Sequence, residues 1–231
     1  MSTPLESRQV LRHAPIREQV ADILRDAIVS MELLPGQVLV ERELCEMTSA
    51  SRPSVREALR QLESEGLVES KNRRGTVVAA PSRERAQQLY EVRGELEGMA
   101  AELFALRADA DQREQLRVAF AAVEEAATSG DGTMLAAKDE LYRVLVDGAG
   151  NPILSEMVAG LQRRVSQLRA LTLTRPGRPS ESLAEIRTIM AAIESGDPVA
   201  ARQAATFHVA QAALTALTFA RDPDPSAAVT T

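Results

Sequence analysis

The apolar positions of the first 80 residues recur at helical spacing and then give way to two short runs typical of strands. A first helix is predicted from Pro15, because apolar residues repeat every three or four positions there: Ile16, Val20, Ile23, Leu24, Ala27 and Ile28. The stretch Leu34-Pro35-Gly36 interrupts the pattern. A short second helix is expected over about residues 41–47, before the sequence TSAS ends it.

A third helix is predicted to begin at Ser51, whose hydroxyl can cap it, and to end near Gly66. The next segment, LVESKNRRGTVVA, contains two runs rich in Leu, Val and Thr around a basic turn with Gly75, which indicates a β-hairpin. Three short helices followed by a basic hairpin predict a winged helix-turn-helix domain over residues 15–80. Residues 1–14 are expected to form an N-terminal arm.

Beyond Pro81 the sequence predicts one helix after another. Five breaks separate these helices, at residues 107–111, 129–132, 148–152, 175–179 and 196–198. The fold class is therefore predicted as mostly α, with an all-helical bundle over residues 81–220 after the winged domain. The last segment, RDPDPSAAVTT (221–231), has little to bury and is expected to be a disordered tail.

Composition restricts the possible classes of protein. A hydrophobic content of 45% over 231 residues is enough for a substantial core. Cys45 is the only cysteine, so no internal disulfide can form and a reducing compartment fits best. The sequence has no apolar run of membrane-spanning length and no apolar signal core, which predicts a cytoplasmic protein without a membrane partner. No motif for a catalytic site or a cofactor is present.

Three arginines lie four residues apart on the third helix, although the formal net charge of the chain is -6. At about 100° per residue, Arg52, Arg56 and Arg60 occupy a face beside the apolar stripe and point outward. Arginines in the first turns of a recognition helix can bind O6 and N7 of guanine in the major groove. Ser51 and Ser54, with the free amides of the helix start, suit phosphate contacts.

The hairpin turn adds further cations that could reach a phosphate or the minor groove: Lys71, Arg73 and Arg74. On charge pattern alone, a solvated helix face explains the arginines equally well. Pairs such as Arg60 with Glu63, or Arg56 with Glu57, would then be ordinary surface charges.

Residues 15–80 resemble the DNA-binding domain of the GntR family of bacterial transcriptional regulators. The matching pieces are LPGQVLVERELCE, SRPSVREALRQLESEGLV and RRGTVV. The resemblance implies that Arg42 of the second helix, Arg52 and Arg56 of the third helix, and the wing around Gly75 contact double-stranded DNA.

Two positions of this segment depart from the family pattern. Met31 stands where a glycine is usual, and Thr48 stands where a leucine is usual. Neither position is on the expected DNA-binding face, so the departures leave the implied function unchanged.

Residues 86–217 resemble the helical FCD effector-binding domain of one GntR subfamily. The stretches that carry the resemblance are YEVRGELEGMAAELFALRA, DELYRVLVDGAGNPILSEMV, RPGRPSESLAEIRTIMAAIESGD and ARQAATFHVAQAAL. Many members hold a divalent metal with an aspartate and three histidines. The resemblance places these four positions at Asp139, Arg143, Ile186 and His208.

No metal is predicted at these positions. Ile186 has no lone pair, and a guanidinium at Arg143 is always charged and would repel a cation. Asp139 and His208 alone are too few for a transition-metal site, which commonly has at least three protein ligands.

Arg143 is instead expected to bind the carboxylate of a small effector through a bidentate fork. Arg93, at a position that resembles a cavity-facing arginine of the family, and His208 would complete this site with Asp139. The alternative is that Asp139 and Arg143 simply pair at i,i+4 over a cavity that has lost its ligand.

The resulting prediction is a ligand-responsive transcriptional regulator, with a repressor favoured. A homodimer would place two recognition helices in successive major grooves of a near-palindromic operator. Two other classes remain as alternatives, an enzyme built around Asp139 and His208 and a protein-interaction module. A regulator whose bundle serves only for dimerisation is a further alternative. The effector and the operator sequence are not identified by the sequence.

Overall fold

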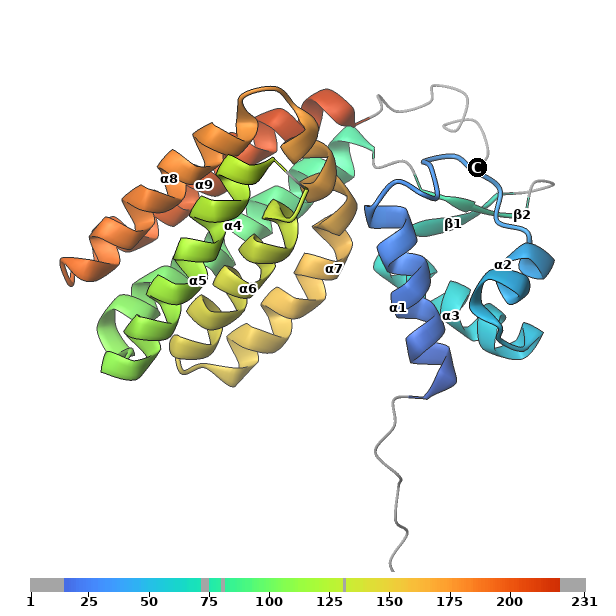
Figure 1. Ribbon diagram of the computed structural model, residues 1–231, viewed down its shortest axis with the longest axis horizontal. Helices are drawn as coiled ribbons and strands as arrows, with labels where there is room; N and C mark the ends of the chain where they lie inside the picture. Colours follow the sequence, from blue (N-terminus) through green and yellow to red (C-terminus); the bar gives the residue numbers. More distant parts are fainter. Residues whose placement is uncertain (1–14, 72–74, 80–81, 131, 221–231) are drawn as a thin grey trace, which may run out of the picture. The chain divides into compact units, whose positions relative to one another are not determined.

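The computed structural model describes residues 15–71, 75–79, 82–130 and 132–220. The chain divides into two compact units, Met1–Val78 and Ala79–Thr231, which are described separately (Figure 1). The expected N-terminal arm (1–14) and tail (221–231) lie outside the described residues.

The described part of the first unit, residues 15–71 and 75–78, contains three helices and a two-stranded antiparallel sheet. Its elements are α1 (Ile16–Val29), α2 (Glu41–Thr48), α3 (Arg52–Glu65), β1 (Val68–Lys71) and β2 (Gly75–Val78). The helices form because their apolar side chains meet in one cluster that includes Leu24, Ile28, Val55 and Leu62. Gly66, with φ of 78°, ends α3 in the left-handed conformation that glycine adopts without strain.

The hairpin is fixed to the linker between α1 and α2. Val68 pairs with Val78 and Lys71 with Gly75 across the two strands. On the other edge of β2, the amide of Leu39 donates to the carbonyl of Thr76, at 2.8 Å, and Val38 forms a bridge to Val77. The backbone of the linker therefore holds the wing in register beside the helices.

The second unit is a bundle of helices joined by short turns. Its described helices are α4 (Arg83–Arg107), α5 (Ala110–Ser129), α6 (Met134–Gly148), α7 (Pro152–Thr174), α8 (Arg178–Glu194) and α9 (Pro198–Phe219). Helix α4 is central, because it packs against α6, α7, α8 and α9. The predicted fold class, a winged helix-turn-helix followed by a helical bundle, is confirmed.

Local chemistry explains where the helices of this bundle begin. The side chains of Ser82, Asp109, Asn151 and Asp197 each accept a hydrogen bond from an amide of the first turn. Close packing also depends on glycine, since a Cβ atom at Gly148 would collide with the ring of Phe104. None of the described helices is both long and apolar enough to cross a membrane.

Candidate DNA-binding surface and buried cationic cavity

The start of α3 presents the groups expected for DNA binding. The hydroxyl of Ser51 accepts a hydrogen bond from the amide of Ser54, and the two hydroxyl oxygens lie 3.0 Å apart. Arg52 is exposed and forms no ion pair within the described residues. Its guanidinium is therefore available to an external acceptor.

The other expected arginines are exposed but have glutamate partners. Nε of Arg56 lies 2.8 Å and 3.0 Å from the two carboxylate oxygens of Glu41, the first residue of α2. Arg42 lies 4.0 Å from Glu46 at the nearest atoms. The hydrogen bond from Arg56 lowers the pKa of the Glu41 carboxyl.

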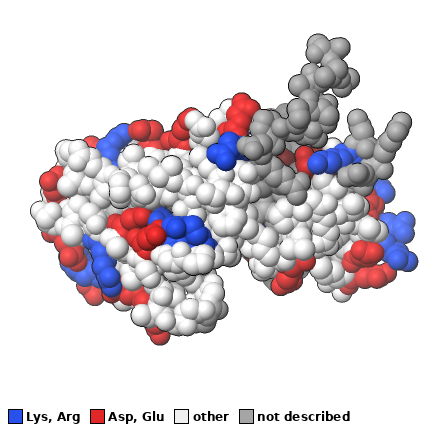
Figure 2. All heavy atoms as spheres, turned by 90° about the horizontal axis from the view of Figure 1, so that it is seen from above, with Lys and Arg blue, Asp and Glu red and all other residues white. Residues whose placement is uncertain are grey.

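The structure does not contain the two ion pairs that a solvated α3 face was expected to form. Arg56 pairs with Glu41 instead of Glu57, and Arg60 pairs with Glu57 instead of Glu63. The pair to Glu41 spans two helices, so no spacing within α3 could have indicated it. Figure 2 shows that basic and acidic side chains also lie beside one another elsewhere on the surface.

The wing is only partly described. Gly75 starts β2 with φ of 75°, and Lys71 at the end of β1 pairs with Glu69 at 2.9 Å. Arg73 and Arg74 lie outside the described residues. That these two arginines contact DNA stays a prediction from the sequence.

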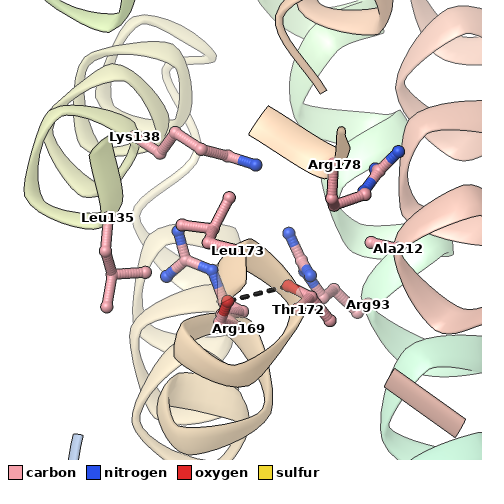
Figure 3. Close-up of a pocket in the computed structure, with 8 residues that line it drawn as sticks. All are labelled: Arg93, Leu135, Lys138, Arg169, Thr172, Leu173, Arg178 and Ala212. Atoms are coloured by element: carbon pink, nitrogen blue, oxygen red, sulfur yellow. Dashed lines mark hydrogen bonds between the residues drawn. The ribbon is translucent and has the colours of Figure 1, made fainter. Parts of the chain in front are cut away.

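The helical unit contains a small cavity that we call the cationic cavity (Figure 3). Its volume is about 10 Å³, which is room for about one water molecule. The residues that line it are Arg93, Leu135, Lys138, Arg169, Thr172, Leu173, Arg178 and Ala212. Figure 3 shows Lys138 reaching from α6 across the opening, with the side chain of Arg169 on α7 below it.

Each guanidinium of the cationic cavity has an acidic partner. Arg93 binds both oxygens of Glu97, at 2.7 Å and 3.2 Å, and the two side chains are each only 2% exposed. Arg178 binds both oxygens of Glu185, at 2.6 Å and 2.7 Å. Arg169 binds Asp139, and it also donates to Gln162. The three guanidinium charges are thus balanced by three carboxylates.

Lys138 differs from these arginines because its partner is neutral. Nζ donates to the hydroxyl of Ser182 at 2.7 Å, and no carboxylate forms an ion pair with it in the described part of the chain. Burial lowers the pKa of Lys138 well below its usual value, and the charges of Arg169, Arg93 and Arg178 lower it further. Burial and the neighbouring guanidiniums therefore both disfavour the charged form of the Lys138 amine.

His208 lies beside the cavity and is fully buried. Burial and the charge of Lys138 lower its pKa to about 4, although a hydrogen bond to Glu185 acts in the opposite direction. Burial raises the pKa of Glu185, but hydrogen bonds from His208 and Arg178 outweigh it and lower the pKa to about 2. At neutral pH the neutral imidazole therefore donates from Nδ1 to the Glu185 carboxylate.

Two buried nitrogens near this cluster have no hydrogen-bond partner within the described residues, Nη2 of Arg169 and Nε2 of His208. Buried polar atoms are rarely left unpaired, because each costs about 1–3 kcal/mol. Their presence beside the cationic cavity is what a site for a ligand or a water molecule requires.

The expected effector residues are only partly brought together. Arg93 lines the cavity, and His208 contacts it through Glu185 and Arg178. Asp139 lies at the margin, where its half-exposed side chain holds Arg169.

Arg143 is not at the cavity, and the expectation that it anchors an effector is corrected. Its side chain is 58% exposed and pairs with Glu140 and Asp147 on the surface. The i,i+4 pair between Asp139 and Arg143 is not formed either. The inner face of α6 instead presents Lys138 and Tyr142, which each precede the expected residue by one position, or about 100° of helix rotation.

The residues at the four expected metal positions do not fit a metal ion. Asp139 is paired with Arg169, Arg143 points outward, Ile186 is buried in the apolar core, and His208 is bonded to Glu185. Within the described residues, no group of three or more His, Cys, Asp and Glu side chains could hold a metal.

Sequence reasoning missed most of the charged residues of this cluster, which are Lys138, Arg169 and Arg178 in the cavity lining and their neighbours Glu97 and Glu185. Arg169 and Arg178 follow no local pattern, since the cavity forms only when α4, α6, α7, α8 and α9 pack together. One available signal was the rarity of lysine. Only two of the 27 basic residues are lysines, and one of them is Lys138, directly after two alanines.

Comparison with known proteins gives matches to two family models. The model described as "Bacterial regulatory proteins, gntR family" matches residues 16–78, and the "FCD domain" model matches residues 88–211.

Individual proteins match over nearly the whole chain. A "Probable D-xylose utilization operon transcriptional repressor" of Paenarthrobacter nicotinovorans is 33% identical, with 84% of this chain and 87% of that protein covered. The "HTH-type transcriptional repressor NanR" of Citrobacter rodentium is 29% identical, with 90% of each covered. A crystal structure of a GntR regulator from Rhodococcus sp. RHA1 has a TM-score of 0.75 at 24% identity, covering 89% of this chain and 99% of that one.

Proposed function

Because this chain belongs to the GntR family of bacterial regulatory proteins and carries an FCD domain, we propose that it is a repressor whose helical unit senses a small anion. It is a transcriptional regulator with a DNA-binding winged helix-turn-helix domain, and it is not an enzyme.

The first element of the proposal is DNA recognition by the N-terminal turns of α3. Arg52, which is exposed and without an ion-pair partner in the described chain, reads a base in the major groove. Arg56 and Arg42 exchange their exposed glutamate partners for DNA, since an exposed ion pair contributes little stability. Ser51 and Ser54 bind phosphate at the start of the helix.

The wing and a second protomer complete the DNA-binding assembly. Arg73, Arg74 and Gly75 contact the backbone or minor groove beside α3. A homodimer places two α3 helices on a near-palindromic operator. Three exposed apolar residues at seven-residue spacing along α4 offer a surface for this association: Val92, Met99 and Leu106.

The observation that supports anion sensing is the charge of the cationic cavity. Three guanidiniums are balanced by Glu97, Glu185 and Asp139, and Lys138 is a fourth basic group, without a carboxylate partner in the described chain. One added anion, such as a carboxylate, would favour the protonated form of Lys138 and would accept a hydrogen bond from Nη2 of Arg169. His208 supports the site by orienting Glu185, which holds Arg178.

Anion binding would regulate the protein by changing how the surrounding helices pack. Helix α4 carries both Arg93 and Glu97 and follows β2 in the chain after residues 79–82. A ligand that binds one packing of α4 better than another shifts the population between the two states. DNA affinity then changes by the same coupling factor.

The alternative is a regulator whose helical unit has lost effector binding. Its supporting observation is the small cavity volume of about 10 Å³, together with the internal carboxylates that already neutralise the three guanidiniums.

A titration with small anions separates these two functions. The full chain is first used to select an operator from random-sequence DNA. Its thermal stability and its affinity for that DNA are then measured with acetate, glyoxylate, glycolate, oxalate and phosphate. We expect at least one anion to change both quantities in the wild type and in Arg143→Ala, and neither quantity in Arg169→Gln. If no anion changes stability or affinity, the alternative function replaces the proposed one.

A further inference from the structure

The polar side chains that line the cationic cavity are mainly hydrogen-bond donors. Four of the described lining residues are basic, three are apolar, and the remaining one is Thr172. The hydroxyl of Thr172 gives its own hydrogen to the carbonyl of Arg169, at 2.7 Å (Figure 3). No acidic side chain belongs to this lining, because Glu97, Glu185 and Asp139 hold their arginines from positions outside it. A group that enters the cavity therefore meets donors.

Two of these donors keep hydrogens that the ion pairs of the cluster do not use. Arg169 binds both Asp139 and Gln162 through Nη1, and its buried Nη2 has no hydrogen-bond partner within the described residues. Nζ of Lys138 donates to the hydroxyl of Ser182 at 2.7 Å, and an amine has at least one more hydrogen to donate. Both nitrogens thus require an acceptor that the described chain does not supply.

The volume of the cavity restricts what this acceptor can be. It is about 10 Å³, which is room for about one water molecule. A carboxylate or a phosphate has several non-hydrogen atoms, so either can enter only if the surrounding helices repack. A chloride or bromide ion is a single sphere only slightly larger than water. An ion of this class fits the described packing with a small adjustment of side chains.

A halide ion also suits the lining better than a water molecule does. A buried water molecule must place its own hydrogens on acceptors, and it typically makes about three hydrogen bonds. A halide ion only accepts hydrogen bonds, which is what Nη2 of Arg169 and Nζ of Lys138 require. It also brings a negative charge next to a buried amine that has no carboxylate partner in the described chain. The protonated amine is then not buried without a counter-ion.

We propose that the cationic cavity binds one halide ion, with chloride as the common ligand, between Nζ of Lys138 and Nη2 of Arg169. This inference rests on the anion site of the proposed function, and it adds which anion the described packing admits. A carboxylate effector would displace this ion and repack α6 and α7, the helices that carry the two donors.

Bromide is the probe that locates the site, because its anomalous scattering identifies the ion directly. Crystals of the full chain are grown in sodium bromide, and an anomalous difference map is calculated at the bromine absorption edge. We expect a peak inside the cavity, within hydrogen-bonding distance of Nζ of Lys138 and Nη2 of Arg169. Bromide peaks confined to the protein surface would overturn the proposal.

Hydrogen exchange in solution tests whether chloride binds at ordinary concentrations. Chloride is raised tenfold at constant ionic strength, with methanesulfonate, which is far larger than the cavity, as the balancing anion. Exchange in the helical unit should slow at least about threefold, and about tenfold is the limit for a site that is already mostly occupied. The first unit reports general salt effects and should not respond. An equal response in both units, or none, means at most binding at crystal concentration and overturns the proposal.

Two variants test whether the amine is required. Lys138→Met keeps a long unbranched side chain but removes the amine, and the chloride effect on exchange should disappear. Arg187→Met is the matched control, since it removes an exposed cation of the same unit and should leave the chloride effect unchanged. A full chloride effect in Lys138→Met would overturn the proposal. If Lys138→Met does not fold, the bromide map and the comparison of the two wild-type units still decide.

Operator affinity separates failure of this inference from failure of the proposed function. If an organic anion changes stability and operator affinity but bromide does not enter the cavity, the halide site is wrong and anion sensing remains. If bromide occupies the cavity and chloride slows exchange, but no anion changes operator affinity, the halide site stands and the sensing function fails. If no anion has any of these effects, both ideas fail.

Discussion

Both units contain arginine–glutamate ion pairs, but the pairs differ in how exposed they are to solvent. In the first unit, the side chains of Arg56 and Glu41 are 58% and 37% exposed, whereas Arg93 and Glu97 in the second unit are each 2% exposed. Arg25 and Glu65, which join α1 to α3, are intermediate. Under the proposed function, the exposed guanidiniums exchange their partner for DNA, and the buried ones respond to a group that enters the cavity.

This difference in exposure determines how each unit should respond to salt, to pH and to the loss of one partner. Exposed pairs are screened by salt and contribute little to folding. Buried pairs are costly to break, because loss of one partner leaves an uncompensated charge in the core. The first unit should therefore respond in DNA affinity, and the second in stability and in pH dependence.

The largest expected effect is on the buried pair of α4. Glu97→Ala leaves the Arg93 charge buried without its partner and should lower the free energy of unfolding of the helical unit by about 3–5 kcal/mol. Glu95→Ala is the matched control on α4. It removes only an exposed partner of Arg202, which lies on α9, and should lower the free energy of unfolding by less than about 1 kcal/mol. Urea unfolding followed by hydrogen exchange measures both. Equal losses in the two variants would remove the distinction between the units.

Acidification should weaken the helical unit more than the DNA-binding unit. The pKa of His208 is lowered to about 4, so between about pH 6.5 and pH 4 the unfolded chain binds more protons than the folded one. Stability contributed by the neutral imidazole is thus present above pH 6.5 and is lost as the pH falls. Lys138, whose pKa is also lowered, acts in the same direction at higher pH, and Glu185, with a pKa of about 2, adds a loss only below about pH 4.5.

From pH 7 to pH 5 the loss at His208 alone should be about 2 kcal/mol. Hydrogen exchange at the two pH values resolves the units, and the described part of the first unit contains no histidine. His208→Gln should reduce the pH dependence of the helical unit. A pH response that is the same in both units would contradict the assignment.

A smaller effect is expected from the backbone of the first unit. Met31 has φ of 64°, a left-handed conformation that costs a side-chain-bearing residue about 1–2 kcal/mol. Met31→Gly should raise the free energy of unfolding of this unit by about 0.5–1 kcal/mol, because the greater entropy of the unfolded glycine offsets part of the gain. Met47→Gly, inside α2, should instead lower it by about 1 kcal/mol. Destabilisation by both substitutions would argue against strain at Met31.

The sequence was sufficient for the fold because helix spacing and caps are local. Helix α3 begins after Ser51 and ends before Gly66, as expected. The breaks between the helices of the bundle coincide with Gly, Asn, Asp and Pro residues. Met31 also departs from the family pattern at a backbone position that favours glycine.

The cavity was harder to predict because its geometry is not local. An error of one residue along α6 was enough to move the expected site from the inner face, at Lys138, to the surface at Asp139 and Arg143. Arg169 and Arg178 join Lys138 only through tertiary packing of three helices. No spacing rule within one helix indicates such a cluster.

The most direct test of the central claim compares two arginines of α3 by fluorescence anisotropy on the selected operator and on random DNA. Arg52→Ala should lose about 1–3 kcal/mol of operator binding, or about 5- to 150-fold in affinity, and should lose preference for one base. Arg60→Ala, whose side chain pairs with Glu57 further along the helix, should keep the preference. If Arg52→Ala binds both DNAs as the wild type does, α3 does not read the operator and the account is contradicted.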